Sequence, residues 1–249
     1  MVLKTAGEVA MMDEANRIVH MVLNGVAERI RPGVTTRELD LWAEQQIRSA
    51  GAVPAFLNYR GYPATLCTSV NDVIVHGIPG ETVLREGDIV GVDCGVVYNG
   101  YYGDAARTFA VGKVREQAQR LLDVTREALD LAVAQVRPGA RLSDIGSAVQ
   151  RHVEKNGFSV VREFVGHGIG TALHEEPQVP NYGEPGRGVK LKPGMVLAIE
   201  PMVNVGLPGV RFDQDGWTAR TEDGSLSAHF EFSVAVTPDG HRVLGVNAA

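Results

Sequence analysis

The chain has 249 residues, of which 22% are charged, and a formal net charge of −6 at pH 7. This length allows one large domain or two small ones with a substantial core. The acidic balance and the absence of a basic run argue against a nucleic-acid-binding or anionic membrane-binding surface, because either would need clustered lysine and arginine. The first twenty residues are rich in charge, and no uncharged stretch is as long as a bilayer is thick, so neither a signal peptide nor a membrane span is expected.

The N-terminal half is predicted to begin with two helices. Apolar residues from Val9 to Ile30 recur at steps of three and four, which is typical of an amphipathic helix, and Pro32-Gly33 ends it. Thr35 and Glu38 form a capping box that opens a second helix, which ends before Gly51. Strand-like segments follow, so this half is expected to run helix, helix, then strands.

A hairpin follows these helices. Asn99-Gly100 separates two strand-like runs, and both residues of such a turn must accept positive φ. The turn fixes the register, which places Asp104 opposite Gly95 on the face that carries Asp93. The two carboxylates are then diagonal neighbours about 7–8 Å apart at Cα, with open space beside Gly95. They would repel each other unless a proton or a cation lies between them.

The C-terminal half repeats this plan. A helical run from Leu121 to Val136 is followed by a helix that Ser143 opens and Asn156-Gly157 closes. The segment 84–93 then matches the segment 191–200, with one carboxylate at the end of each apolar run. Asp93 and Glu200 therefore hold the same place in the two halves.

Two further pairs of matching sequence segments support the repeat. Arg31-Pro32-Gly33 matches Arg137-Pro138-Gly139, and Val75–Ile78 matches Gly166–Ile169. We expect the two copies, about 1–112 and 113–249, to form a single catalytic domain, 1–249, with an internal pseudo-two-fold. Folding face to face, the copies would bring their matching polar residues to a shared central site.

Five residues together predict a metal centre, although each has a simpler interpretation alone. Asp93 could be a strand-end carboxylate, Asp104 a solvent-facing hairpin residue, and His167 a loop residue between glycines. Glu200, after a buried run, and Glu231, between two phenylalanines, would be buried acids that need a partner. One histidine and four carboxylates suit two divalent cations better than a thiolate zinc site. Cations also explain how such a cluster of acids could be buried at all.

At these positions the chain resembles a type I methionine aminopeptidase of the bacterial kind, from its first helix to nearly its last strand. Besides the five positions, the resemblance rests on three motifs, Val75–Pro79, Gly166–Gly170 and His174–Pro177. It implies an α+β pita-bread fold, in which two pseudo-symmetric αβ halves surround a curved antiparallel sheet and the helices lie outside.

The resemblance also implies a role for each acidic residue and for the histidine. Asp104 and Glu231 would bridge two divalent metal ions. Asp93 would chelate one of these ions, while His167 and Glu200 would complete the coordination of the other. Glu200 would in addition carry a proton from the attacking water to the leaving nitrogen. Cobalt, manganese, iron and zinc all remain open, because the sequence does not identify the metal.

Substrate contacts follow from the same resemblance. His76 and His174 would be catalytic residues that contact the substrate near the scissile peptide, without binding metal. The methionine side-chain pocket would be lined by Tyr59, Tyr62, Cys67 and Trp217. Phe56 and Leu173 stand where the commonest bacterial pattern has Cys and Phe, which leaves the pocket shape open. A secondary monovalent-cation site would lie near Asn71, Val73 and Ser227.

The implied function is metal-dependent removal of the N-terminal methionine from nascent proteins and peptides, with a small second residue preferred. Hydrolysis would use a hydroxide that bridges the two metals. The expected partner is a peptide or nascent chain that begins with methionine, with transient contact to the ribosome and no nucleic acid or membrane. The protein is expected to be a monomer in the cytoplasm, where Cys67 and Cys94 would stay reduced.

Two alternatives remain open. A Xaa-Pro aminopeptidase or prolidase would share the five ligands, but such enzymes usually carry an additional N-terminal domain. A non-catalytic relative that acts as a binding module for RNA or protein would be expected to lack some ligands and to present a basic face. This chain keeps every ligand and is acidic.

Overall fold

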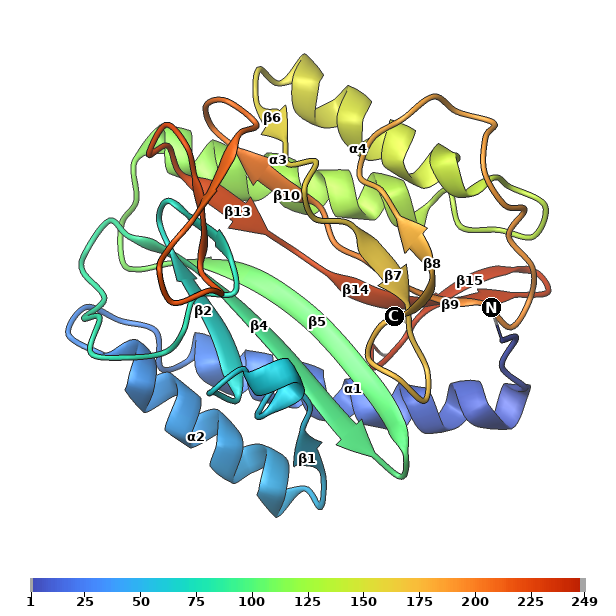
Figure 1. Cartoon of the computed structure of the whole chain (residues 1–249), viewed down its shortest axis with the longest axis horizontal. Helices are drawn as coiled ribbons and strands as arrows, with labels where there is room; N and C mark the ends of the chain where they lie inside the picture. Colours follow the sequence, from blue (N-terminus) through green and yellow to red (C-terminus); the bar gives the residue numbers. More distant parts are fainter. Residues whose placement is uncertain (1, 247–249) are drawn as a thin grey trace.

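The computed structural model describes residues 2–246, and its helices form two pairs on opposite sides of the strands (Figure 1). These helices are α1 (Ala6–Ala27), α2 (Thr36–Ser49), α3 (Glu116–Val133) and α4 (Leu142–Lys155), with a short 3₁₀ helix η1 (Tyr59–Gly61). None of the helices within residues 2–246 has the length and apolar character needed to cross a membrane.

The helix ends follow local capping chemistry. The predicted capping box of α2 is confirmed, since Glu38 N donates to Thr35 Oγ1 at 3.2 Å and Thr35 N donates to Glu38 Oε2 at 2.7 Å. Helix α4 begins one residue before the predicted Ser143, because Asp144 Oδ2 accepts from Arg141 N at 2.8 Å and so satisfies the first turn. Helix α1 ends at Ala27, a turn before the predicted end.

In the N-terminal half the longest strands form the predicted hairpin. The strands are β1 (Val53–Pro54), β2 (Leu66–Val70), β3 (Val73–Val75), β4 (Ile89–Tyr98) and β5 (Tyr101–Ala110). Strand β4 pairs with β1, β2 and β5, all antiparallel. The predicted register is confirmed, because Gly95 pairs with Asp104. Asn99 and Gly100 have φ angles of 50° and 81°, as the two-residue turn requires.

The C-terminal half contains more and shorter strands. They are β6 (Ser159–Val160), β7 (Gly166–Gly168), β8 (Glu175–Val179), β9 (Val196–Ile199), β10 (Met202–Asn204), β11 (Val210–Phe212), β12 (Ala219–Thr221), β13 (Ser227–His229), β14 (Phe232–Thr237) and β15 (Gly240–Val243). One sheet has the order β15-β14-β9-β7-β8, and β10 lies between β6 and β13.

Strands β9 and β10 together match β4 of the first half. Ile199 pairs with Phe232 and Met202 pairs with His229 in one continuous register, so only Glu200-Pro201 interrupts this line. Proline lacks an N–H and cannot donate to the ladder, which explains an interruption at this point.

Backbone pairings elsewhere repeat between the halves. The strand pairs β1–β4 and β6–β10 correspond, through Val53 with Val97 and Ser159 with Asn204. The two Pro-Gly turns make the same hydrogen bond at 2.9 Å, from Gly33 N to Leu84 O and from Gly139 N to Leu191 O. The fold is therefore α+β with two pseudo-symmetric halves, as predicted.

The predicted match of Val75–Ile78 with Gly166–Ile169 is wrong. Strand β7 pairs with β9 as β2 pairs with β4, through His167 with Ala198 and Ser69 with Gly91. The counterpart of His167 is therefore Ser69, whereas His76 lies just after β3 with a φ angle of 61°.

The two His-Gly motifs look alike because each glycine meets a neighbouring backbone closely. A Cβ on Gly77 would lie 2.2 Å from Thr68 O, and one on Gly168 would lie 2.4 Å from Glu176 O. The shared motif thus reflects a common packing need and not a common place in the repeat.

The halves meet where β5 runs beside β13 and β14 (Figure 1). Glu231 N donates to Ala106 O at 2.9 Å. Two side-chain bonds flank it, at 2.8 and 2.9 Å, from Thr108 Oγ1 to His229 O and from Ser233 Oγ to Asp104 O. The last two bonds are related by the pseudo-two-fold, so the axis passes close to the Glu231–Ala106 bond.

Apolar clusters support the junction from both sides. One lies under α3 and α4 and includes Leu129 and Ile145, and the other lies under α1 and α2 and includes Leu23 and Leu39. A third cluster, which includes Phe56, lies between them and forms part of a cavity wall. The site described below is therefore enclosed by packed cores.

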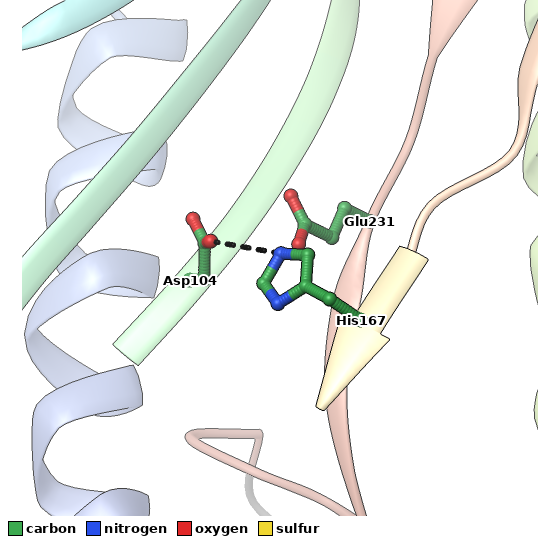
Figure 2. A group of neighbouring side chains, drawn as sticks. All are labelled: Asp104, His167 and Glu231. Atoms are coloured by element: carbon green, nitrogen blue, oxygen red, sulfur yellow. Dashed lines mark ion pairs between the residues drawn. The ribbon is translucent and has the colours of Figure 1, made fainter. Parts of the chain in front are cut away.

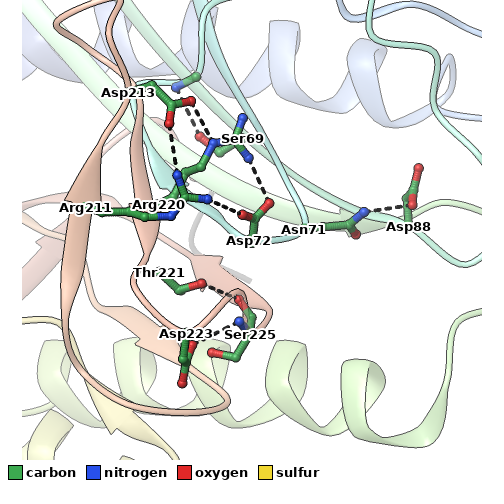
Figure 3. Close-up of polar contacts among 11 residues, drawn as sticks. Ser69, Asn71, Asp72, Asp88, Arg211, Asp213, Arg220, Thr221, Asp223 and Ser225 are labelled. Carbon is green, nitrogen blue, oxygen red and sulfur yellow. Dashed lines mark hydrogen bonds and ion pairs between the residues drawn. The ribbon is translucent and has the colours of Figure 1, made fainter.

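An ion-pair network ties β3 to the β11–β12 hairpin (Figure 3). Arg220 lies between Asp72 and Asp213, with Nη1 2.8 Å from Asp72 Oδ1 and Nε 2.7 Å from Asp213 Oδ2. Arg211 bonds the same two carboxylates at 3.4 and 3.3 Å. This network fixes the start of β3, because Asp72 directly precedes Val73, and so anchors the short strand that His76 follows.

Gly103→Ala should lower the free energy of unfolding by about 1–3 kcal/mol, because overpacking forces the surroundings to shift. An added Cβ would lie 2.7 Å from Ala15 C and 2.8 Å from Asn16 N, both in the backbone of α1. Urea denaturation measures the change. Gly7→Ala is the control, since nothing lies within 4 Å of its Cβ, and it should not lower stability. Equal midpoints for both variants would contradict this close approach of β5 to α1.

Candidate metal centre

The predicted ligands and substrate contacts line one cavity of about 230 Å³ between the two halves. The lining side chains are Phe56, Tyr59, Arg60, Tyr62, Cys67, His76, Asp93, Asp104, His167, Leu173, His174, Glu200, Trp217 and Glu231. Residues far apart in sequence thus come together at one place.

Regular strands position the five candidate ligands. Asp93 and Asp104 project from β4 and β5, and His167 projects from β7. Glu200 directly follows β9, and Glu231 directly precedes β14. Because strand ladders set the distances between these backbones, the side chains are held close together without help from loops.

Asp104, His167 and Glu231 form the tightest group (Figure 2). One ligand atom from each lies within 4.8 Å of the others. His167 Nε2 is 3.9 Å from Asp104 Oδ2 and 3.5 Å from Glu200 Oε1. This group could hold a metal ion, since oxygen and imidazole ligands suit divalent cations such as manganese, iron and zinc.

Three of the five candidate ligands have a buried carboxylate oxygen without a hydrogen-bond partner among the described residues. These atoms are Asp93 Oδ1, Asp104 Oδ1 and Glu231 Oε1. A buried acceptor left without a partner costs about 1–3 kcal/mol, and more when it is charged. Divalent cations in this cavity would give such oxygens partners, so the donor set fits a divalent metal centre.

Burial and mutual repulsion change the acidity of this cluster. Burial raises the pKa of Asp93 to about 7 and that of Glu200 to about 7. The pKa values of Asp104 and Glu231 are also raised well above the ordinary value, first by burial and then by neighbouring carboxylates. Burial lowers the pKa of His167, which favours the neutral imidazole that binds metals.

His76 and His174 reach the cavity from outside the ligand cluster. The His174 ring lies 4.4 Å from the His167 ring, and its Nδ1 is 2.8 Å from the Tyr59 hydroxyl. The His76 ring lies 6.4 Å from the Trp217 ring, and burial lowers the pKa of His76 to about 4. Both histidines are therefore expected to be neutral hydrogen-bonding groups at neutral pH.

The segment before His174 is held in place. Glu175 Oε1 accepts from Thr171 N at 3.0 Å and from Ala172 N at 3.3 Å, and the same carboxylate forms an ion pair with Lys4. Lys4 N in turn donates to Gly194 O at 2.7 Å. The N-terminal segment thus anchors the backbone next to His174.

The apolar wall of the cavity surrounds Tyr62. Its hydroxyl donates to Leu66 O and to Gly77 O, both at 3.0 Å, and its ring meets the Trp217 ring edge-on at 5.1 Å. Cys67 is buried beside it.

The space expected beside Gly95 is not open. A Cβ there would lie 2.5 Å from Phe56 Cε1, so the Phe56 ring fills it. The sequence prediction on this point was wrong because the β1 segment, which is distant in sequence, covers the hairpin.

Two polar residues near the cavity were not predicted. His229 Nε2 is 3.5 Å from Glu200 Oε2 and buried, and the alternation that places it on the same strand face as Glu231 was the only signal. Arg60 lines the cavity with an exposed side chain and a positive φ of 50°. Nothing in its sequence context indicated this position.

The residues of the predicted monovalent-cation site lie close together. Ser227 N donates to Asn71 O at 2.9 Å, and Asn71 and Val73 line a second cavity of about 230 Å³. A cation there stays a prediction.

Residues 10–238 match the model of metallopeptidase family M24. The cluster described above is thus the candidate metal centre of a metallopeptidase, and the chain belongs to family M24.

Similar proteins cover the whole chain. Methionine aminopeptidase of Clostridium perfringens is 51% identical over 243 residues, which are 98% of each chain. The crystal structure of methionine aminopeptidase from Rickettsia prowazekii is 41% identical, with a TM-score of 0.98 over 99% of this chain and 100% of that one. Prolidase from Pyrococcus furiosus is 24% identical with a TM-score of 0.80, over 100% of this chain and 66% of that one, which shows a shared fold alone. The predicted pita-bread fold is thereby confirmed.

The metal-free protein should become less stable as pH rises from about 4 to about 7. The folded state keeps protons on Asp93 and Glu200 up to about pH 7, whereas the unfolded chain releases them near pH 4. The unfolded state therefore binds fewer protons in this window, and the free energy of unfolding falls. Thermal unfolding of chelator-treated protein at pH 5 and 7.5 measures the change.

Adding a divalent metal at pH 7.5 should restore the lost stability, because metal binds the native cluster far better than the unfolded chain. Asp93→Asn should flatten the pH dependence of the metal-free protein. Glu184→Gln, whose parent side chain is 83% exposed, should leave it unchanged. A melting temperature independent of both pH and metal would contradict the conclusion that these buried acids form a metal-binding cluster.

Proposed function

We infer that the chain is a methionine aminopeptidase, a metal-dependent hydrolase that removes the N-terminal methionine from nascent proteins and peptides. The observation on which this inference depends is that Asp104, His167 and Glu231 converge in one cavity that also has an apolar wall. The 51% identity to a curated methionine aminopeptidase over nearly the full length supports the same activity.

The proposed metal centre would hold two divalent cations through Asp93, Asp104, His167, Glu200 and Glu231. Three buried oxygens without partners support this ligand set. When bound, such ions supply a water that ionises near neutral pH and polarise the scissile carbonyl. Cobalt, manganese, iron and zinc are all candidates.

The side chains around the metals have separate tasks in this proposal. Glu200 would carry a proton between the attacking water and the leaving nitrogen, since its carboxylate lines the cavity beside the other proposed ligands. His174 and His76 donate hydrogen bonds where negative charge develops on the carbonyl oxygen. A donor to that charge lowers the barrier because the interaction strengthens only in the transition state.

The apolar wall explains the proposed selectivity. Tyr59, Tyr62, Cys67 and Trp217 line the same cavity as the candidate ligands, and their largely apolar surfaces would suit an unbranched thioether. Phe56 and Leu173 narrow the same space. A small second residue is preferred in this proposal, because the next side chain must pass close to the histidines.

The cellular setting is proposed from the same assignment. The substrate would be a nascent chain that begins with methionine, met in the cytoplasm with transient contact to the ribosome. A monomer is proposed, since one chain supplies all five candidate ligands to the cavity. A monovalent cation near Asn71, Val73 and Ser227 would support the turn after β2.

Hydrolysis of Met-Ala-Ser beside Ala-Pro-Ala, after reconstitution with each divalent metal, tests the proposal. We expect release of methionine from Met-Ala-Ser and slow or no turnover of Ala-Pro-Ala. Faster turnover of Ala-Pro-Ala would move the assignment to the Xaa-Pro branch. No hydrolysis of either peptide with any metal would favour a binding module.

His174→Ala should fold and bind metal normally but lower kcat by about 10²–10³, as loss of one transition-state donor typically does. His167→Ala should instead lose metal affinity first, since its imidazole lies within the ligand cluster. Metal content by elemental analysis and steady-state kinetics on both variants decide the matter. Metal loss in the His174 variant, or an unchanged kcat, would reverse the two assignments.

A further inference from the structure

We propose that Tyr59 is a positioning residue for His174 and more than part of the cavity wall. Its hydroxyl donates to His174 Nδ1, so the imidazole keeps its proton on Nε2 and presents an N–H to the substrate carbonyl. The inference rests on the proposed function, in which His174 donates that hydrogen bond.

The contact between the two side chains is direct. Tyr59 Oη lies 2.8 Å from His174 Nδ1, and the rings are tilted by 37° with centroids 5.4 Å apart. Within residues 2–246 His174 makes no other side-chain hydrogen bond. Its second ring nitrogen is therefore left for the substrate.

The direction of this bond follows from the acidity of the two groups. A phenol O–H is a good donor with an ordinary pKa near 10, and an unprotonated imidazole nitrogen is a better acceptor than a phenol oxygen. The bond made by one ring nitrogen sets the tautomer of the other. The reverse arrangement would leave a bare lone pair on Nε2, which cannot donate to a carbonyl.

The backbone around Tyr59 is held rigidly. Asn58 and Arg60 on either side have left-handed φ angles of 67° and 50°, which residues other than glycine seldom adopt. Tyr59 N donates to Phe56 O at 2.8 Å, and Tyr62 N donates to Tyr59 O at 3.0 Å. This short turn aims the phenol at His174, whose own neighbour Glu175 is anchored to Lys4.

The second tyrosine of the cavity makes a different contact. The Tyr62 hydroxyl donates to the backbone oxygens of Leu66 and Gly77 and so serves the wall. Only the Tyr59 hydroxyl bonds an imidazole among the tyrosines of the described residues. The two phenols therefore have separate roles, although both were predicted as pocket lining.

Tyr59→Phe keeps the ring and removes the hydroxyl, so it isolates the proposed bond. We expect kcat for Met-Ala-Ser to fall about 10–100-fold, the usual loss when an orienting partner is removed, with KM changed less than about twofold. Tyr101→Phe is the matched control, because its hydroxyl bonds Glu8 at 3.1 Å at the surface. That variant should keep wild-type kinetics.

The nitrogen chemical shifts of His174 provide a readout that does not depend on turnover. In ¹⁵N NMR of the zinc-loaded protein, the wild type should show His174 as a single Nε2–H tautomer, and Tyr59→Phe should show a mixture. In a His174→Ala background, Tyr59→Phe should cause no further fall in kcat, because the residue it positions is gone.

The outcomes separate the inference from the proposed function. Wild-type kcat with an unchanged tautomer in Tyr59→Phe would overturn the inference, as would a raised KM with unchanged kcat, which is the signature of a wall residue. A wild type that hydrolyses no Met-Ala-Ser with any metal would overturn the proposed function instead. The tautomer measurement would then still decide whether Tyr59 sets the proton position.

Discussion

The burial of four carboxylates at one junction is the constraint on which the rest of the structure depends. Without a cation, these groups raise one another's pKa and leave oxygens without partners. Only a scaffold that gains stability elsewhere can hold these carboxylates together. The two apolar clusters under the paired helices provide that stability. The cluster is thus a local cost of folding that metal binding would convert into a gain.

Pseudo-symmetry brings the acids together but does not make the site symmetric. Asp93 and Glu200 hold matching places, and by the same register Asp104 matches His229 while Ala106 matches Glu231. One half thus contributes a methyl group where the other contributes a carboxylate. His229 lies beside Glu200 because it takes the place of Asp104, which is the diagonal neighbour of Asp93 in the other half.

Sequence predicts the parts of this site that local geometry fixes. The Asn99-Gly100 turn determines the hairpin register, and hence the shared face of Asp93 and Asp104, over a span of a dozen residues. The contacts that escaped prediction join segments far apart in the chain, such as Phe56 against Gly95 and Tyr59 against His174, which is 115 residues away. The two His-Gly motifs suggested a wrong equivalence between the halves. Glycine is required wherever two backbones pack closely, whether or not the positions are equivalent in the repeat.

The candidate metal ligands lie on or next to strands, whereas most candidate substrate contacts lie outside strands. These two kinds of backbone differ in rigidity. The candidate metal ligands project from paired strands or directly adjoin them, where ladder hydrogen bonds fix the distances that a cation would require. Most of the candidate substrate contacts lie in loops or in the short helix η1, although Cys67 lies in β2. The left-handed residues Asn58, Arg60 and His76 lie at or beside these contacts and hold particular backbone shapes. Changes in these loops can therefore reshape the substrate pocket while the ligand cluster stays intact. Changes in the strands, in contrast, would disturb the candidate ligands and the cavity together, since these ligands line it.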